Sequence, residues 1–561
     1  MFARERDGGG MVTPTDRRDR SAYRVMPRDT GGATEDDLVV VEMLPAQRHG
    51  PPRARVVELL GRLDDPLAPS LVAIREHGIP VAFPPEALAE AAAAQPVELG
   101  RRSDLRDLAL VTIDGEDARD FDDAVWAEPD GAGWHAVVAI ADVAWYVRPD
   151  SALDRAARER GNSVYFPDRV VPMLPEALSN ELCSLKPEVE RACLAIHLWI
   201  DEAGRTTRHL VVRGLMRSAA RLTYEAVQAR IDAGGDPVVT PLHGAFKALD
   251  RWRRERGALD LDLPEFKVTL APDGTPVEIG QRRRLDSHRL IEELMIAANV
   301  AAAEVLGTRR AICMYRVHDR PEAERLDALA KLLDEIGQKG LRLARGQVVR
   351  PAHFARILEA ASGTAEAAMI HQMVLRAQAQ AAYSPSNIGH FGLGLRNYAH
   401  FTSPIRRYAD LLVHRALIQA LELGGGGALE TDPEGFAALG RHLSDTERRA
   451  ARAERQVMDR YVARFMEARI GNEFEARITG VVRFGLFVAL AENGADGLVP
   501  IGTLPRDDYR FDRQRHLLSG RRTRTQYRLG QTVTVRLVEY DAIGAGLVFV
   551  LVGGNDTRVR R

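Results

Sequence analysis

The densest group of potentially reactive side chains lies within residues 112–124, which read TIDGEDARDFDDA. The acids of this segment are Asp114, Glu116, Asp117, Asp120, Asp122 and Asp123. Carboxylates held so close together repel one another, and their pKa values rise unless a cation neutralises them. Hard divalent cations bind oxygen ligands of this kind. The segment therefore predicts a site for Mg²⁺, with Mn²⁺ as a substitute.

Two alternatives for the acidic segment stay open on these residues alone. An arbitrary D-x-D-D pattern is more often a solvated acidic turn than a metal site. An EF-hand loop is a weaker alternative, because the order D-x-D-x-D-G with a glutamate at the twelfth position is absent.

A second reactive segment comprises HFGL at residues 390–393 and YAHFTSPIRRYAD at residues 398–410. Its Ser-Pro pair is typical of a helix start, and it precedes two adjacent arginines, Arg406 and Arg407. Guanidinium groups and the N–H groups of a helix start both bind phosphate. The segment predicts a phosphate site, although an arginine pair that caps a surface helix accounts for it equally well.

Shorter motifs accompany these two segments along the chain. They are IADV (140–143), RGNSVYFP (160–167), LSNELCSL (178–185), ARLTY (220–224), LIEELM (290–295) and YRVH (315–318). In this order the set closely resembles the catalytic RNB domain of the RNase II and RNase R family, over about residues 101 to 465. NSVYFP and AHFTSPIRRY are more similar to RNase R. The resemblance implies a processive, hydrolytic 3′-to-5′ exoribonuclease that releases nucleoside 5′-monophosphates.

The resemblance also implies the catalytic residues. The positions that fall on the family's catalytic aspartates are Asp114, Asp120, Asp122 and Asp123, and Asp117 is left as an acid outside the family pattern. These aspartates would hold Mg²⁺, which activates water and neutralises the leaving oxygen. Arg406 falls on the arginine that grips the terminal phosphates and stabilises their developing charge.

Further residues are implied to contact RNA. Tyr165 matches an aromatic that stacks on bases near the 3′ end, and Glu454 resembles the acid that holds the 3′-terminal nucleotide. Tyr224 and Glu292 resemble residues that contact the 2′-hydroxyl, which separates RNA from DNA. Arg407 is assigned to RNA with them. A core tyrosine at 165 and helix-face packing of Glu292 are the competing interpretations.

One expected RNA contact has no clear counterpart in this chain. The family's second stacking aromatic would lie near residues 265–268, where the matching position is the aliphatic Val268. Phe266 is the nearest possible substitute. The base clamp implied by the resemblance is therefore incomplete in the sequence.

The fold predicted from these patterns is an α+β multidomain protein. Residues 1–22 form a flexible arm, and residues 23–100 a partial cold-shock or OB-like domain with a linker. The resemblance implies an RNB catalytic domain over residues 101–465 and an OB-fold barrel of ribosomal-protein type over residues 470–552, with a tail at residues 553–561. The family's first cold-shock domain is expected to be absent, because only about 100 residues precede the catalytic domain.

Periodicity and propensity predict the main elements of these domains. The expected strands cover residues 23–27, 38–43, 56–63, 134–147, 474–478, 481–490, 532–539 and 546–551. The expected helices cover residues 86–95, 285–306 and 445–468, the first of them as an exposed helix or linker.

The C-terminal region carries its own features for binding RNA. Residues 478–488 resemble the first hairpin of the OB domain, and Phe484 and Phe487 offer surface for base stacking. Residues 505–528 contain eight arginines and three aspartates, a local excess of five positive charges. The net charge of the whole chain, -2, conceals this cluster.

Composition narrows the remaining function classes. No apolar run approaches the roughly 18 to 20 residues of a membrane span, and the N-terminus lacks a signal-peptide pattern. These patterns predict a cytoplasmic location. The resemblance implies single-stranded RNA with a free 3′ end as the partner, and we expect a monomer. The three cysteines are expected to be core thiols.

Two other function classes remain as alternatives. A catalytically silent RNA-binding regulator on the same scaffold would require loss of metal ligands or of the phosphate arginine, and all of these are present. A DEDD-type exonuclease would need acids dispersed along its domain, whereas here they lie within ten residues.

Overall fold

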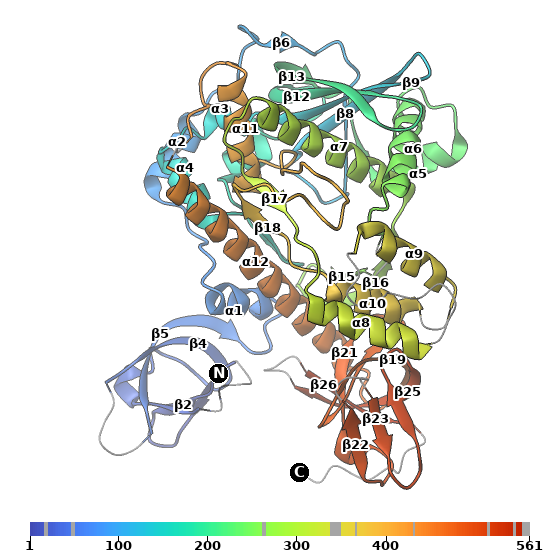
Figure 1. The fold of residues 1–561 in the computed structure, drawn as a ribbon. Helices are drawn as coiled ribbons and strands as arrows, with labels where there is room; N and C mark the ends of the chain where they lie inside the picture. The colour runs from blue at the N-terminus through green and yellow to red at the C-terminus, as the bar shows by residue number, and fades with distance from the viewer. Residues whose placement is uncertain are drawn as a thin grey trace.

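The structure is a computed structural model of the 561-residue chain, and three folded parts follow one another along it (Figure 1). It describes residues 1–15, 19, 21–45, 51–260, 265–336, 349–364, 367–429, 432–512, 517–541 and 546–552. A small N-terminal sheet precedes a large central α/β domain, and a C-terminal barrel follows it. The long helix α12 (Pro433–Glu467) runs along the central domain toward the barrel.

The N-terminal part is a five-stranded sheet with the order β1-β2-β3-β5-β4. Its strands are β1 (Phe2–Arg4), β2 (Gly10–Val12), β3 (Tyr23–Val25), β4 (Asp37–Met43) and β5 (Arg53–Arg62). The short 3-10 helix η1 (Pro27–Asp29) follows β3. The sheet agrees with the OB-like domain that the sequence predicted.

The expected flexible arm over residues 1–22 is wrong where β1 and β2 form. Phe2 is fully buried, and a Cβ on Gly10 would collide with its ring. Strands of three residues are too short to show an alternating pattern, so the charged composition of this segment concealed the pair. Residues 16–18 and 20 of the expected arm lie outside the described residues.

Two helices connect this sheet to the central domain. Helix α1 (Ala68–Glu76) packs against β5 and α12. Helix α2 (Pro85–Ala93) confirms the helix expected at 86–95 and packs against α4 (Ala152–Arg160). Because Ala87 and Ala91 are buried in that contact, α2 is a docked helix rather than a free linker.

A seven-stranded sheet with the order β14-β7-β8-β9-β12-β13-β6 forms the centre of the catalytic domain. Its strands are β6 (Ser103–Asp104), β7 (Val111–Asp114), β8 (Asp123–Asp130), β9 (Gly133–Ala141), β12 (Glu190–Ile200), β13 (Thr206–Arg217) and β14 (Ala220–Thr223). Helix α6 (Val239–Glu255) packs against β8, β9 and β12, and helix α7 (Asp286–Thr308) packs against β9, β12 and β13. Helix α7 confirms the helix expected at 285–306.

The strand expected over residues 134–147 is too long. Strand β9 ends at Ala141, and the short helix α3 (Val143–Tyr146) follows. Between them the buried Asp142 forms ion pairs with Arg102 at 2.8 Å and Arg213 at 2.7 Å. These partners lie far from Asp142 in the chain, so no local pattern reveals where β9 ends.

The remaining elements of the central domain surround this sheet or extend toward the barrel. They are β10 (Val164–Tyr165), β11 (Val170–Val171), the π-helical turn η2 (Ala177–Leu182), α5 (Tyr224–Ala233), β15 (Glu265–Leu270), β16 (Pro276–Arg282), β17 (Tyr315–Val317), α8 (Ala323–Ile336), α9 (Pro351–Ala361), α10 (Ala367–Ala377), β18 (Ala382–Ser384) and α11 (Tyr408–Ala420). Helix α12 includes the helix expected at 445–468 and begins 12 residues earlier, at Pro433.

The C-terminal part contains a closed barrel with the order β19-β20-β21-β26-β25, which confirms the predicted OB fold. Its strands are β19 (Glu473–Val482), β20 (Gly485–Leu490), β21 (Asp496–Pro500), β25 (Thr532–Asp541) and β26 (Gly546–Leu551). The turn between β19 and β20 lies at residues 483–484, so the strand expected at 481–490 is two strands. The predicted tail at 553–561 lies outside the described residues.

The arginine-rich segment forms a small sheet that the sequence did not predict. After the 3-10 helix η3 (Ile501–Thr503), the order is β22-β23-β24. Its strands are β22 (Tyr509–Asp512), β23 (Leu517–Gly520) and β24 (Gln526–Arg528).

Within the described residues, no helix combines the length and the apolar character that a membrane span requires. Cys183, Cys193 and Cys313 are free and buried, as expected for core thiols.

Candidate active site

The acid cluster lies at the junction of β7 and β8. Asp114 is the last residue of β7, and Asp123 is the first residue of β8. The connecting loop carries Asp120 and Asp122. Because β7 and β8 are neighbours in the sheet, their backbone pairing brings the two ends of this loop together.

Asp122 is the point at which the two reactive segments meet in space. Its side chain is only 4% exposed. Its Oδ1 accepts the backbone N–H of Ile405 at 2.8 Å. Its Oδ2 lies 3.3 Å from Nε of Arg406 and has no hydrogen bond among the described residues. Residues far apart in the chain therefore form one site.

The carboxylates of the cluster are short of positive charge. Burial, together with neighbouring carboxylates, raises the pKa of Asp114 and raises that of Asp122 well above its ordinary value. Burial and the charge of Asp114 raise the pKa of Asp123 to about 7. A buried carboxylate with an unbonded oxygen is costly unless a cation compensates it. The donor atoms therefore suit a hard divalent cation.

The carboxylates nevertheless do not form a closed metal cage. Among the residues that the structure describes, no three His, Cys, Asp or Glu side chains come close enough together to hold a metal ion. The Asp120 carboxylate instead accepts a hydrogen bond from the Tyr165 hydroxyl at 2.8 Å. Binding an ion would require these side chains to converge.

Asp117, the acid outside the family pattern, takes no part in this cluster. Its side chain is exposed and forms an ion pair with Nζ of Lys267 at 3.1 Å. Burial therefore distinguishes the acids of the cluster from the exposed Asp117, although the sequence places them side by side.

The two adjacent arginines have different surroundings. The Arg406 side chain is 43% exposed, and its Nη2 donates to the Ser403 hydroxyl at 2.8 Å. Arg407 instead pairs with the fully buried Asp410 at 2.9 Å, at the start of α11. Asp410 also accepts the N–H of Ser403. Arg407 is thus engaged within the fold, whereas Arg406 faces the acid cluster.

Tyr165 and Glu454 lie together at the rim of the cluster. Tyr165 is 38% exposed, so it is not a core tyrosine. Its backbone N–H donates to Oε1 of Glu454 on α12 at 2.8 Å. This bond fixes which face of α12 is turned toward the site, a point that the Arg- and Glu-rich helix sequence left open.

Tyr224 follows β14, which lies next to β7 on the side away from β8. It begins α5 directly after Thr223, which pairs with Asp114 in the parallel contact between β14 and β7. The Tyr224 ring stacks on His288 of α7, with ring centroids 4.1 Å apart and planes 20° apart. Sequence reasoning missed His288, because nothing local marks a histidine that stacks across helices.

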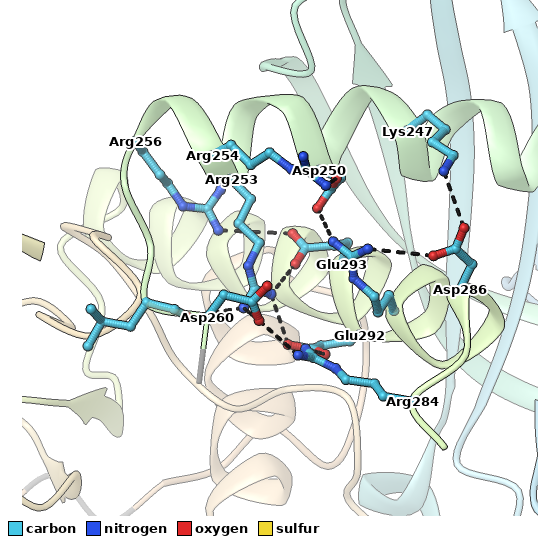
Figure 2. A network of polar contacts seen from close by, with 12 residues as sticks. Lys247, Asp250, Arg253, Arg254, Arg256, Asp260, Arg284, Asp286, Glu292 and Glu293 are labelled. Atoms are coloured by element: carbon cyan, nitrogen blue, oxygen red, sulfur yellow. Dashed lines mark hydrogen bonds and ion pairs between the residues drawn. The ribbon is translucent and has the colours of Figure 1, made fainter. Parts of the chain in front are cut away.

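Glu292 belongs to a network of ion pairs between α6 and α7 (Figure 2). It pairs with Arg253 at 2.9 Å and with Arg284 at 2.7 Å. Although burial opposes ionisation, these arginines hold the pKa of Glu292 below its ordinary value. Arg253 also pairs with the buried Glu293. Glu292 is therefore a fixed carboxylate on α7, rather than a residue that only packs the helix face.

The structure also shows where the two residues lie that stand in place of the second stacking aromatic. Val268 is buried in a hydrophobic cluster with residues of α1 and α12. Phe266 packs against Gly494 of the barrel, where a Cβ would collide with its ring. Both side chains are thus used for packing in this structure.

The C-terminal part presents the aromatics on its barrel, and most of the arginines expected to bind RNA on the segment that forms β22 to β24. Phe484 is 56% exposed, and its ring meets Phe487 edge-on with centroids 6.2 Å apart. The exposed arginines are Arg506, Arg510, Arg521, Arg522, Arg524 and Arg528. Arg513 and Arg515 lie outside the described residues.

Comparison with known proteins identifies the family. Residues 102–423 match the RNB domain, residues 11–84 a cold shock domain, and residues 467–549 an S1 RNA binding domain. Ribonuclease R of Escherichia coli (strain K12) is 41% identical over 557 residues, covering 94% of this chain and 68% of that protein. The chain belongs to the ribonuclease R family.

Other ribonuclease R proteins agree with this assignment. The Aquifex aeolicus protein is 39% identical over 96% of this chain and 78% of its own length. The structure of Mycoplasma genitalium RNase R with ribose methylated single-stranded RNA is 25% identical, with a TM-score of 0.83. It covers 98% of this chain and 99% of that chain. Ribonuclease R nucleases require a divalent metal, which agrees with the donors of the acid cluster.

Proposed function

We propose that this protein degrades single-stranded RNA processively from a free 3′ end and uses Mg²⁺ bound at the acid cluster, with Mn²⁺ as a substitute. Its family makes it a hydrolytic 3′-to-5′ exoribonuclease, and the products would be nucleoside 5′-monophosphates. The observation that carries the proposal is the contact between the buried Asp122 and Arg406. A silent RNA-binding regulator is not favoured, because every expected acid and this arginine are present.

The residues proposed to hold the metal are Asp114, Asp120, Asp122 and Asp123. The chemistry that a divalent ion supplies in such a site is activation of water and neutralisation of the leaving 3′ oxygen. Arg406 is well placed to bind the reacting phosphate, because its exposed guanidinium already lies against Asp122. Its fixed positive charge would stabilise the charge that develops on phosphorus.

The residues around the cluster are proposed to position the 3′-terminal nucleotides. Tyr165 stacks on a base, while Glu454 fixes its backbone and approaches the terminal nucleotide. Tyr224 and Glu292 are proposed to contact the sugar. Tyr224 follows the strand that pairs with Asp114, and Glu292 lies on α7, the helix whose His288 stacks on Tyr224. A hydroxyl and a carboxylate can both bond a 2′-hydroxyl, which DNA lacks. Arg407 supports this site from within the fold.

The barrel is proposed to capture the strand before it reaches the acid cluster. Phe484 and Phe487 offer stacking surface, and the arginines of residues 506–528 attract the phosphates. RNA is the ligand in the Mycoplasma genitalium complex, which supports this partner. A monomeric state and a cytoplasmic location complete the proposal.

The test uses one oligoribonucleotide labelled at either its 3′ or its 5′ end. With Mg²⁺, the 3′ label should leave at once as a mononucleotide, and the 5′ label should pass to a short end product without intermediates. Without metal, both substrates should stay intact. Internal cuts, or equal rates in the presence of a chelator, would overturn the proposal.

A further inference from the structure

The position of the Tyr224 ring bears directly on its proposed contact with the sugar. The residue before it pairs with Asp114, so the ring stands beside the strand that supplies the acid cluster. The charges of Asp114 and Asp123 act on its hydroxyl, and burial together with these charges raises the pKa of Tyr224. A phenol at this point keeps its proton and can donate a hydrogen bond to a nearby sugar oxygen.

His288 restricts the orientation of this ring. The stacked geometry, with centroids 4.1 Å apart and a 20° tilt, covers one face of Tyr224. His288 is itself fixed, because its Nδ1 accepts the N–H of Leu285 at 3.2 Å in the first turn of α7. The neighbouring Ser287 N–H donates to Gln228 of α5 at 3.2 Å, which joins the two helices.

The same face of α7 carries Glu292, the second proposed sugar contact. Residues four apart on a helix lie one above the other, so His288 and Glu292 point to the same side. Glu292 is held by Arg253 and Arg284, as Figure 2 shows. One helix face therefore fixes both proposed sugar contacts, one by stacking and the other by ion pairs.

We propose that His288 is a positioning residue for ribose recognition, acting through the ring of Tyr224. Loss of the imidazole would let the phenol turn about its side-chain torsions and would weaken its bond to the 2′-hydroxyl. The acid cluster and Arg406 would remain in place. This inference rests on the proposed function of Tyr224 as a sugar contact.

The experiment measures discrimination between two sugars with the full-length protein. Its readout is the ratio of kcat/KM for an oligoribonucleotide to kcat/KM for the same oligomer with deoxyribose at its last two positions. His288→Ala should lower this ratio by about tenfold, the weight of one well-made hydrogen bond. Turnover of the deoxyribose substrate should stay within about twofold, since it lacks the 2′-hydroxyl contact.

Three further variants separate stacking from helix capping. His288→Phe keeps a flat ring and should show the wild-type ratio. His288→Asn keeps an acceptor without a ring and should lower the ratio as much as His288→Ala does. His353 is the matched control, because its Nδ1 accepts the N–H of Arg350 at 3.1 Å in the first turn of α9. His353→Ala should therefore leave the ratio unchanged.

The outcomes also separate this inference from the function on which it rests. If Tyr224→Phe lowers the ratio but His288→Ala does not, His288 has no positioning role. If His288→Phe lowers the ratio as much as His288→Ala does, stacking on Tyr224 is not the cause of sugar discrimination by His288. If Tyr224→Phe leaves the ratio unchanged, the proposed sugar contact itself fails, and the inference fails with it.

Discussion

The acid cluster at the β7–β8 junction and the ion-pair network between α6 and α7 both hold carboxylates inside the central domain, with different electrostatic results. In the network, arginines hold the pKa values of Glu292 and Asp260 below their ordinary values against the effect of burial. In the cluster, the carboxyl of Asp122 has Arg406 near one oxygen and a pKa well above its ordinary value.

The charges of the network therefore stabilise the fold, whereas the charges of the acid cluster are compensated only when a ligand binds. The network contains its own counter-ions, and Arg253 alone pairs with Glu292, Glu293 and Asp260. Glu293 is the exception within it, since deep burial still raises its pKa. Among the residues that the structure describes, the cluster has no comparable partners, so a cation from solution is needed to complete it. Breaking each region should therefore affect a different property.

The largest effect is expected for Asp122→Asn, which should reduce single-turnover hydrolysis more than about 10³-fold while leaving RNA affinity largely intact. The amide keeps the oxygen that accepts the Ile405 N–H but loses the charge needed to hold metal. Because a poorly compensated buried charge disappears, stability should not fall. Asp117→Asn is the matched control in the same loop, and it should hydrolyse at the wild-type rate. Near wild-type turnover of Asp122→Asn would rule out the metal assignment.

The network should respond in the opposite way. Arg253→Met leaves Glu293 buried without its closest cation, and we expect a loss of about 3–5 kcal/mol in the free energy of unfolding. Urea titration measures this loss. The control is Arg254→Met, whose 72% exposed side chain pairs with Asp250, and which should change stability by less than about 1 kcal/mol. Equal losses in both variants would show that the network is not a unit of stability.

Arg406→Ala should lower the single-turnover rate by roughly 10²-fold, because a fixed charge at the reacting phosphate is lost. Affinity for long RNA should change much less, since this contact is one among many. Rapid-quench kinetics and equilibrium binding separate the two effects. An unchanged chemical rate with uniformly weaker binding would make Arg406 a peripheral contact.

A smaller effect is expected for Tyr165→Phe, which keeps the stacking ring but removes the hydrogen bond to Asp120. We expect a loss of about threefold to tenfold in turnover, the weight of one ordinary hydrogen bond. Tyr165→Ala, which also removes the ring, should in addition change the length of the end product on a sizing gel. Identical behaviour of the two variants would show that the ring does not contact the bases.

Much of this architecture could be predicted from the sequence, because the relevant signals are local or carried by motifs. The apolar period of α7 and the short strands of the barrel place these elements within a few residues. The close spacing of the acids of residues 114–123 marks a candidate metal site, but the spacing alone also fits a solvated acidic turn, and the resemblance to the family decided between them. By contrast, β1 and β2 are too short to show a period.

The rest depends on partners that lie far apart in the chain. Ile405 bonds Asp122 from 283 positions away, and Arg253 bonds Glu292 from 39 positions away. The sequence could not show that Arg407 pairs with Asp410 within the fold while the half-exposed Arg406 faces the acid cluster, because both have the same residue type. Similarly, only the fold places His288 against Tyr224.

The most direct test of the acid cluster is thermal unfolding of the protein with and without Mg²⁺ at several pH values. Burial raises the folded-state pKa of Asp123 from 3.8 to about 7. Its protonated form therefore contributes stability that is full below about pH 4 and is lost as the pH rises through about 7. Mg²⁺ supplies the positive charge that the site lacks, and it binds only where the carboxylates are ionised. It should therefore raise Tm by about 2–5 °C at pH 8 and far less at pH 5. Asp123→Asn should show a weaker form of both dependences, because Asp114 and Asp122 still carry raised pKa values. A wild-type Tm that does not respond to Mg²⁺ at pH 8 would contradict the assignment of this cluster as the metal site.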